Sequence, residues 1–313
     1  MGLKCNGRCL LAALFVCALS VGQARAIILA DKTYRNKSAP TGSLTNSGWQ
    51  WQGAWGSFIG TPIAKNYFVT ASHVGGAVGQ SLTLGGKTFK TTAMFDDPNS
   101  DLRIWKTSSS FSSWAPIYTG SSEIGKTAML FGRGTQRGSN VLVNGTTHGW
   151  NWGPADGKLS WGENKIKTIA NGGAGVGQAI GYTFDRSAHG DHVSNEGITS
   201  AGDSSGAIFV NSSGWKLAAI NYSADGPFSL NGGANFMASI FDKGGLSVNG
   251  QFFSDGSTDI PGFGYATRIS SNQAWIKSVL GGSAAPSLGS LVPEPASLSL
   301  IAFAGSLLMR RRR

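Results

Sequence analysis

The chain has 313 residues, of which 41% are hydrophobic and only 13% charged, and its formal net charge at pH 7 is +10. Seven of the 26 basic residues lie near the two ends, at Lys4, Arg8, Arg25 and 310–313, so the central part carries only a small positive charge. This distribution excludes the basic surface of a nucleic-acid-binding protein, and the length is sufficient for a sizeable packed core.

The first 26 residues have the pattern of a secretory signal peptide. A basic start is followed by an apolar run over residues 10–21 and then by Ala24-Arg25-Ala26, which has small residues where signal peptidase requires them. The apolar run is short for a membrane span. We therefore predict export and cleavage by signal peptidase after Ala26; an uncleaved membrane anchor is the alternative.

All three cysteines of the chain, Cys5, Cys9 and Cys17, lie within this predicted signal peptide. The exported protein would therefore have no disulfide, although it leaves the reducing cytoplasm. Its stability would have to come from a packed core rather than from covalent cross-links between cysteines.

Residues 27–281 have the pattern of an all-β protein. Short runs of alternating apolar and polar residues lie between turn residues, and helical periodicity is nearly absent. Residues 81–90 predict a hairpin around Gly85-Gly86, and residues 207–220 predict a second hairpin. We expect a barrel or sandwich, with one helix at 272–280.

Three segments carry residues suited to acyl transfer. His73 follows the apolar run 67–71, Asp101 precedes another apolar run, and Ser204 lies in the glycine-bracketed sequence 202–206. A serine hydroxyl needs a base within hydrogen-bond reach, which a histidine provides, and a buried carboxylate fixes the tautomer of that histidine. The backbone N–H groups of Gly202 and Ser204 would stabilise the developing oxyanion.

The order His, Asp, Ser and the residues around each of them resemble the trypsin-like (chymotrypsin-fold) serine proteases. Residues 131–134 resemble the strand that opens the second barrel of this family, and residues 261–265 resemble its last strand. The resemblance implies two antiparallel β-barrels with the site in the cleft between them. It also implies a serine endopeptidase that acts on proteins or peptides and needs no metal or organic cofactor.

The resemblance assigns roles to single residues. Ser204 would be the nucleophile, His73 the general acid–base and Asp101 the residue that orients the histidine. The base of the primary specificity pocket would fall at Ile198, beside Thr199. Because no acidic residue lies there, we expect cleavage after a small or apolar side chain rather than after Arg or Lys.

Several positions leave alternatives open. Asp96 and Asp97 compete with Asp101 for the role of the orienting carboxylate, and the spacing of residues 97–101 also resembles half of a calcium loop. Ser205 replaces the usual glycine after the nucleophile, where it would crowd the turn and offer a rival hydroxyl, and Ala207 replaces the usual proline. The sequence 189–192 contains two histidines and could indicate a metal site, but we interpret it as a surface loop near the cleft.

Asp203, just before the nucleophile, needs a partner if it is buried. In animal members of the family, a branched apolar N-terminus pairs with the aspartate at this position. Cleavage after Ala26 would leave Ile27 at the N-terminus, and we expect its ammonium group to serve as the partner. One of three arginines is the alternative, namely Arg133, Arg137 or Arg186.

The C-terminal end resembles the PEP-CTERM sorting signal of Gram-negative bacteria. It contains Pro293-Glu294-Pro295, an apolar stretch over residues 298–309 and four terminal arginines. The resemblance implies transient anchoring in the inner membrane, processing by an exosortase-type enzyme and release to the cell surface or medium. An ordinary C-terminal anchor is the alternative.

The chain is thus divided into five predicted parts. These are a signal peptide (1–26), an N-terminal barrel with His73 and Asp101 (27–115), a C-terminal barrel with Ser204 and the helix (116–281), a linker (282–291) and a sorting tail (292–313). Two non-enzymatic roles remain as alternatives to the endopeptidase: a catalytically degenerate binding module, and a structural β-protein of the extracellular matrix.

Overall fold

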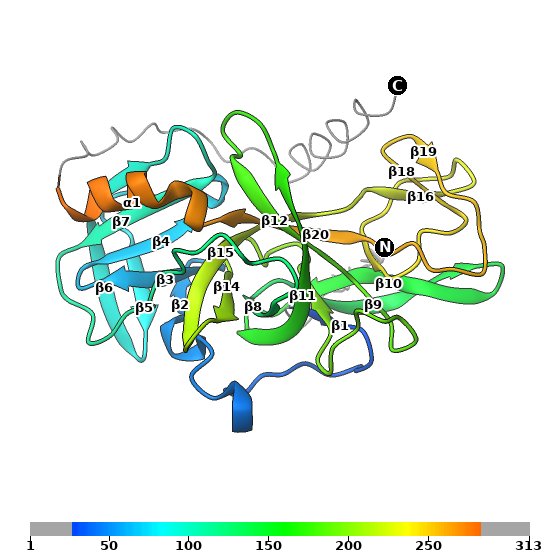
Figure 1. The fold of residues 1–313 in the computed structure, drawn as a ribbon, viewed down its shortest axis with the longest axis horizontal. Helices are drawn as coiled ribbons and strands as arrows, with labels where there is room; N and C mark the ends of the chain where they lie inside the picture. Colours follow the sequence, from blue (N-terminus) through cyan, green and yellow to red (C-terminus); the bar gives the residue numbers. More distant parts are fainter. Residues whose placement is uncertain (1–26, 283–313) are drawn as a thin grey trace, which may run out of the picture.

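The computed structural model describes residues 27–282, so the predicted signal peptide and sorting tail lie outside the described residues (Figure 1). Two closed antiparallel barrels dominate the fold. The strands of the first barrel are β2 (Gly53–Trp55), β3 (Phe58–Ala64), β4 (Tyr67–Ala71), β5 (Ser81–Leu84), β6 (Lys87–Asp96) and β7 (Leu102–Thr107). Their order around the barrel is β2-β3-β4-β7-β6-β5.

The second barrel has the strand order β11-β12-β20-β15-β14-β8. Its strands are β8 (Thr127–Gly132), β11 (Ser160–Asn171), β12 (Gln178–Thr183), β14 (Ala207–Asn211), β15 (Trp215–Ala224) and β20 (Phe263–Arg268). The two predicted hairpins are present as β5–β6 and β14–β15. Gly85 and Gly86, between β5 and β6, have φ values of 56° and 74°, as a tight two-residue hairpin turn requires.

Two small sheets lie beside the second barrel, and we call them the distal sheets (Figure 1). One contains β9 (Thr135–Val143), β10 (Thr146–Ala155) and β17 (Ala238–Ile240). The other contains β16 (Phe228–Leu230), β18 (Leu246–Val248) and β19 (Gln251–Phe252). They share a small apolar core formed by Val141, Val143, Phe228, Ala238, Ile240, Leu246 and Val248.

The remaining elements are short. They are β1 (Ile28–Leu29), β13 (Gly197–Ile198), α1 (Gln273–Leu280) and the 3-10 helices η1 (Gly42–Leu44), η2 (Trp49–Trp51), η3 (Ser72–Val74) and η4 (Ser270–Asn272). The predicted C-terminal helix is confirmed as α1, with Ile276 and Val279 buried in the same core cluster as the first barrel. β1 pairs with β13, so the start of the described chain packs against the second half of the molecule.

Aromatic side chains form much of the core of the first barrel. Trp55 packs against Trp105 with ring centroids 4.7 Å apart and against Phe68 at 5.2 Å, and all three side chains are fully buried. Truncation of such a buried aromatic side chain costs about 3–5 kcal/mol. The aromatic core of the first barrel therefore contributes substantially to the stability of the fold.

The fold class predicted from the sequence is confirmed by the two closed barrels and the short C-terminal helix. Within residues 27–282, no helix has the length and apolar character needed to cross a membrane.

Candidate active site

His73 and Asp101 meet because their strands are neighbours in the first barrel. β4 and β7 run antiparallel, and Ala71 at the end of β4 pairs with Leu102 at the start of β7. The residues that follow β4 and precede β7 therefore lie at the same edge of the barrel. His73 lies in η3, directly after β4, and Asp101 lies directly before β7.

The carboxylate of Asp101 binds both the backbone and the ring of His73. Asp101 Oδ1 accepts a hydrogen bond from the backbone N–H of His73 at 2.9 Å, and Oδ2 lies 2.6 Å from His73 Nδ1. The side chain of Asp101 is only 6% exposed, whereas that of His73 is 20% exposed. A carboxylate at Nδ1 leaves Nε2 as the atom that can accept a proton from a nucleophile.

The two competing carboxylates make other contacts. Asp96 forms an ion pair with Arg103. Asp97 accepts hydrogen bonds from the hydroxyl of Ser100 at 2.7 Å and from the backbone N–H of Asn99 at 3.0 Å. Asp97 therefore stabilises the turn that leads to Asp101, and the carboxylate that bonds to the ring of His73 is that of Asp101.

Ser204 lies in a tight turn that is tied to β15. Within the turn, the N–H of Gly206 donates to the carbonyl of Asp203 at 3.0 Å. The side chain of Asn221 in β15 donates to the same carbonyl at 3.2 Å, and the N–H of Ser205 donates to the carbonyl of Asn221 at 3.0 Å. A Cβ on Gly206 would lie 1.9 Å from the carbonyl oxygen of Phe131, so this position of the turn requires glycine.

Ser205 has a structural role that sequence reasoning missed. Its φ is 66°, in the left-handed region that favours glycine, and its side chain is fully buried. Its hydroxyl donates to the carbonyl of Ile59 at 2.6 Å and accepts from the N–H of Ala71 at 3.0 Å. We expected Ser205 to crowd the turn and to offer a rival hydroxyl. Instead, its hydroxyl links the Ser204 turn to the first barrel, and one of the bonded residues, Ala71, lies two positions before His73.

The backbone around Ser204 presents two free N–H donors. Within residues 27–282, the amides of Gly202 and Ser204 donate no hydrogen bond to any other group. In the same described range, the Ser204 hydroxyl forms no hydrogen bond with His73 Nε2. Catalytic hydrogen bonds are often long before substrate binds and shorten in the complex.

Tyr222 is a second neighbour of the histidine that the sequence did not reveal. Its ring lies edge-on to the ring of His73, with centroids 5.6 Å apart. Burial raises the pKa of Tyr222, and the nearby charge of Asp101 raises it further. Because Tyr222 follows Asn221, β15 contacts both the Ser204 turn and the histidine.

Asp203 is completely buried and accepts several hydrogen bonds. Its Oδ1 accepts from the N–H of Gly134 at 2.8 Å, and its Oδ2 accepts from the N–H and the hydroxyl of Ser200, both at 2.8 Å. The backbone nitrogen of Ile27 lies 3.3 Å from Oδ2 and 3.4 Å from Oδ1. Burial raises the pKa of Asp203 to about 6, although these hydrogen bonds oppose the shift.

Of the three arginines considered as partners of Asp203, Arg137 and Arg186 contact other groups, and Arg133 is partly buried. The guanidinium of Arg137 stacks on Trp150 at 3.4 Å, and Arg186 pairs with Asp259. The pKa of Arg133 is lowered by burial, and the charge that opposes this shift is that of Asp156.

The remaining predicted site residues lie in the segment 185–199. Ile198 is buried in β13, where it pairs with Ile28, and Thr199 is also buried. The two histidines of the 189–192 loop lie close to different carboxylates. His189 Nδ1 lies 2.9 Å from Asp185 Oδ1, and His192 Nε2 lies 2.6 Å from Asp31 Oδ2.

No protein-family model and no curated protein matches the sequence. Among solved structures, the chain is similar to a mutant of human heparin binding protein, with a TM-score of 0.51 and 12% identity over 82% of this chain and 100% of that one. It is also similar to neuropsin, a serine protease expressed in the limbic system of mouse brain. In that case the TM-score is 0.47 and the identity 15%, over 75% of this chain and 95% of that one. The two closed barrels and the similarity to heparin binding protein show that the chain has the chymotrypsin-like fold.

Proposed function

We propose that this chain, which has the two-barrel chymotrypsin-like fold, is an exported serine endopeptidase. The observation that carries the proposal is the pairing of a partly exposed His73 with a buried Asp101 through Nδ1. The hydroxyl bridge of Ser205 supports the assignment of Ser204, because it fixes the Ser204 turn next to the histidine.

The proposed reaction hydrolyses a peptide bond in two halves. Ser204 Oγ attacks the peptide carbonyl while His73 Nε2 takes the hydroxyl proton, and the resulting oxyanion is stabilised by the N–H groups of Gly202 and Ser204. His73 then gives its proton to the leaving amine, and an acyl-enzyme remains. Water, deprotonated by His73, attacks this ester, and the second intermediate collapses as His73 returns the proton to Ser204 Oγ, which releases the acid and restores the enzyme.

This mechanism is tested by hydrolysis of a casein or peptide-library substrate. Replacement Ser204→Ala should lower turnover by roughly 10⁶, because members of such a triad act as a unit. Full activity of Ser204→Ala would refute the assignment. Cleavage sites from the same library test the expected preference for small or apolar side chains, which rests on the placement of the pocket base at Ile198 and Thr199.

The same proposal includes activation by export. Ile27 N is the atom that signal peptidase would convert from an amide into an ammonium group, and it lies 3.3 Å from the buried carboxylate of Asp203. A buried carboxylate without a partner is strongly disfavoured, so the new charge would stabilise the ionised form of Asp203 and with it the Ser204 turn. The contacts of Arg137 and Arg186 with other groups support Ile27 over these two arginines.

Sorting at the C-terminus belongs to this proposal as well. An exosortase-type enzyme in a Gram-negative bacterium would remove the segment after Pro295, following transient anchoring in the inner membrane. Mass spectrometry of protein from its native host should then show a chain without the terminal arginines. An intact C-terminus on an active surface protein would indicate a plain anchor.

A binding module is the alternative with a specific observation in its favour. One protein of similar fold is named as a heparin binding protein, and one fold hosts many unrelated functions. A structural role in the extracellular matrix is favoured only by the glycine content and the tail. In both cases the folded protein would have no reactive serine.

A further inference from the structure

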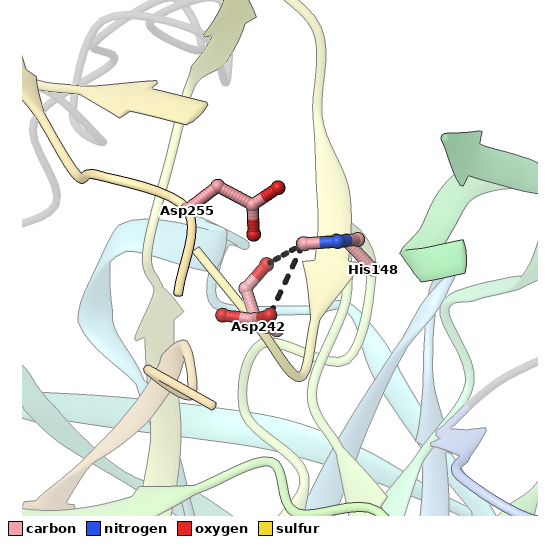
Figure 2. Close-up of side chains that lie close together, drawn as sticks. All are labelled: His148, Asp242 and Asp255. Carbon is pink, nitrogen blue, oxygen red and sulfur yellow. Dashed lines mark hydrogen bonds and ion pairs between the residues drawn. The ribbon is translucent and has the colours of Figure 1, made fainter. Parts of the chain in front are cut away.

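The distal sheets contain a cluster of three side chains that the proposed protease mechanism does not use. His148, Asp242 and Asp255 each offer a ligand atom, and these atoms lie within 4.8 Å of one another. Figure 2 shows the three side chains directed toward one another from different segments. His148 belongs to β10, Asp242 follows β17 and Asp255 follows β19.

Two of the three ligand atoms are held in place by the surrounding structure. His148 is buried, and the N–H groups of Phe241 and Asp242 both donate to its carbonyl, which aligns β10 with the end of β17. Asp242 Oδ1 accepts from the N–H groups of Gly244 at 2.9 Å and Ile260 at 3.1 Å. These bonds leave Oδ2 of Asp242 directed at His148 Nδ1, which is 3.3 Å away.

The polar groups at the centre of the cluster are only weakly satisfied. The side chain of Asp242 is 8% exposed, and within residues 27–282 its Oδ2 contacts only the imidazole. His148 Nδ1 is shared between this oxygen and the carbonyl of Asp242 at 3.2 Å. Both distances lie at or beyond the long end of the usual range of about 2.7–3.2 Å for such a hydrogen bond.

The charge of the cluster favours a cation. Two carboxylates face a single imidazole, and the neighbouring cations are directed elsewhere. The ammonium group of Lys243 lies 3.3 Å from Asp225 Oδ2, and Arg186 pairs with Asp259. Asp255 is exposed and accepts a hydrogen bond from Asn144 at 3.1 Å, so its carboxylate closes the cluster on the solvent side.

We propose that His148, Asp242 and Asp255 bind a divalent transition-metal cation, with Zn²⁺ as its representative. An imidazole nitrogen and two carboxylate oxygens are a donor set that suits Zn²⁺ better than Ca²⁺, which prefers oxygen ligands alone. Zn–ligand bonds are about 2.0–2.2 Å long, so the ligand atoms would draw closer together than in the structure described here. Rotation of the exposed Asp255 side chain provides this movement, and water would occupy the fourth position.

The cation would act as a cross-link. It would join β10, the turn after β17 and the loop after β19, three segments whose apolar core is small. Small structures with little core are commonly stabilised by disulfides or a metal ion, and the described chain contains no cysteine. We therefore expect Zn²⁺ to protect the distal sheets from unfolding, without taking part in peptide hydrolysis.

The test uses the exported protein, stripped with EDTA and titrated with ZnCl₂ by calorimetry in the presence of excess Mg²⁺. The wild type should bind one equivalent of Zn²⁺ at this site, and Asp255→Asn should weaken binding by at least about tenfold, a loss that even outer-shell substitutions commonly cause. Asp255 is exposed, so this variant folds even if the buried His148→Gln does not. Ser257→Ala, an exposed substitution two residues further along the same loop, is the control and should bind as the wild type does.

A second readout is limited digestion of the distal sheets by added subtilisin, with the Ser204→Ala background preventing self-cleavage. Zn²⁺ should slow cleavage within residues 223–262 of the Ser204→Ala protein. It should not slow this cleavage in the double variant that carries both Ser204→Ala and Asp255→Asn. The proposal is overturned if the stripped protein binds no Zn²⁺, or if Asp255→Asn binds and is protected as well as the control. Binding of that kind would place the ion elsewhere, for example at His73.

Discussion

Replacement of Ser205 tests whether the bridge between the two barrels stabilises the protein. Ser205→Ala removes the hydroxyl that donates to Ile59 and accepts from Ala71, both in buried positions. Each hydrogen bond contributes about 1 kcal/mol net, and a buried donor left without a partner costs about 1–3 kcal/mol. We therefore expect Ser205→Ala to lower the free energy of unfolding by about 2–4 kcal/mol.

Ser205→Gly separates the hydroxyl from the backbone conformation. Glycine also loses the two hydrogen bonds, but it relieves the left-handed φ of 66°, which disfavours other residues by about 1 kcal/mol. The glycine variant should therefore be more stable than the alanine variant. Ser213→Ala is the matched control, because Ser213 has a φ of 54° but is exposed, and its stability should not change measurably.

The free energy of unfolding of each variant is measured by urea denaturation followed by tryptophan fluorescence. Peptide hydrolysis is measured on the variants that fold. If Ser205→Ala unfolds with the same free energy as the wild type and the Ser213 control, the hydroxyl bridge does not hold the barrels together. A fully active and fully stable Ser205→Ala would also remove the main structural support for the position of Ser204.

Three further predictions concern charge. Asp101→Asn should remain folded but lose roughly 10⁴ in kcat, because the imidazole is then held in the wrong tautomer; if Asp97→Asn shows this loss instead, the orienting carboxylate is misassigned. One alanine inserted before Ile27, with the new N-terminus confirmed by sequencing, should greatly reduce activity without unfolding, and unchanged activity would exclude the ammonium as partner of Asp203. Burial raises the pKa of Glu196 to about 9, so its contribution to stability is present below about pH 4.5 and is lost as the pH rises through 9. Glu196→Gln should therefore flatten the decline in unfolding free energy between about pH 4.5 and pH 9, and an unchanged slope over this range would contradict the raised pKa.

The parts of the fold that depend on local sequence were predictable. The β5–β6 hairpin follows from two glycines that adopt positive φ between alternating strands, and the helix at 273–280 follows from a short run of helix-forming residues. His73 and Asp101 could be placed because each lies at the end of a strand. The sequence does not reveal that β4 and β7 are neighbours, which brings the two residues together.

The remaining features depend on contacts between distant residues. The hydroxyl of Ser205 binds a carbonyl 146 positions earlier, so its role could not be read from the turn itself. One of the distal sheets includes the pairing of β17 with β10, although these two strands are far apart in the chain and separated by most of the second barrel. His148 and Asp255 accordingly have no motif in the sequence that links them.

Active-site labelling shows whether Ser204 is a nucleophile activated by His73. The folded, exported protein is treated with a fluorophosphonate probe, and the modified peptide is identified by mass spectrometry. We expect one label, attached to Ser204, and we expect it to disappear in His73→Ala. A folded protein that takes up no label, or one labelled on Ser205, would contradict this assignment.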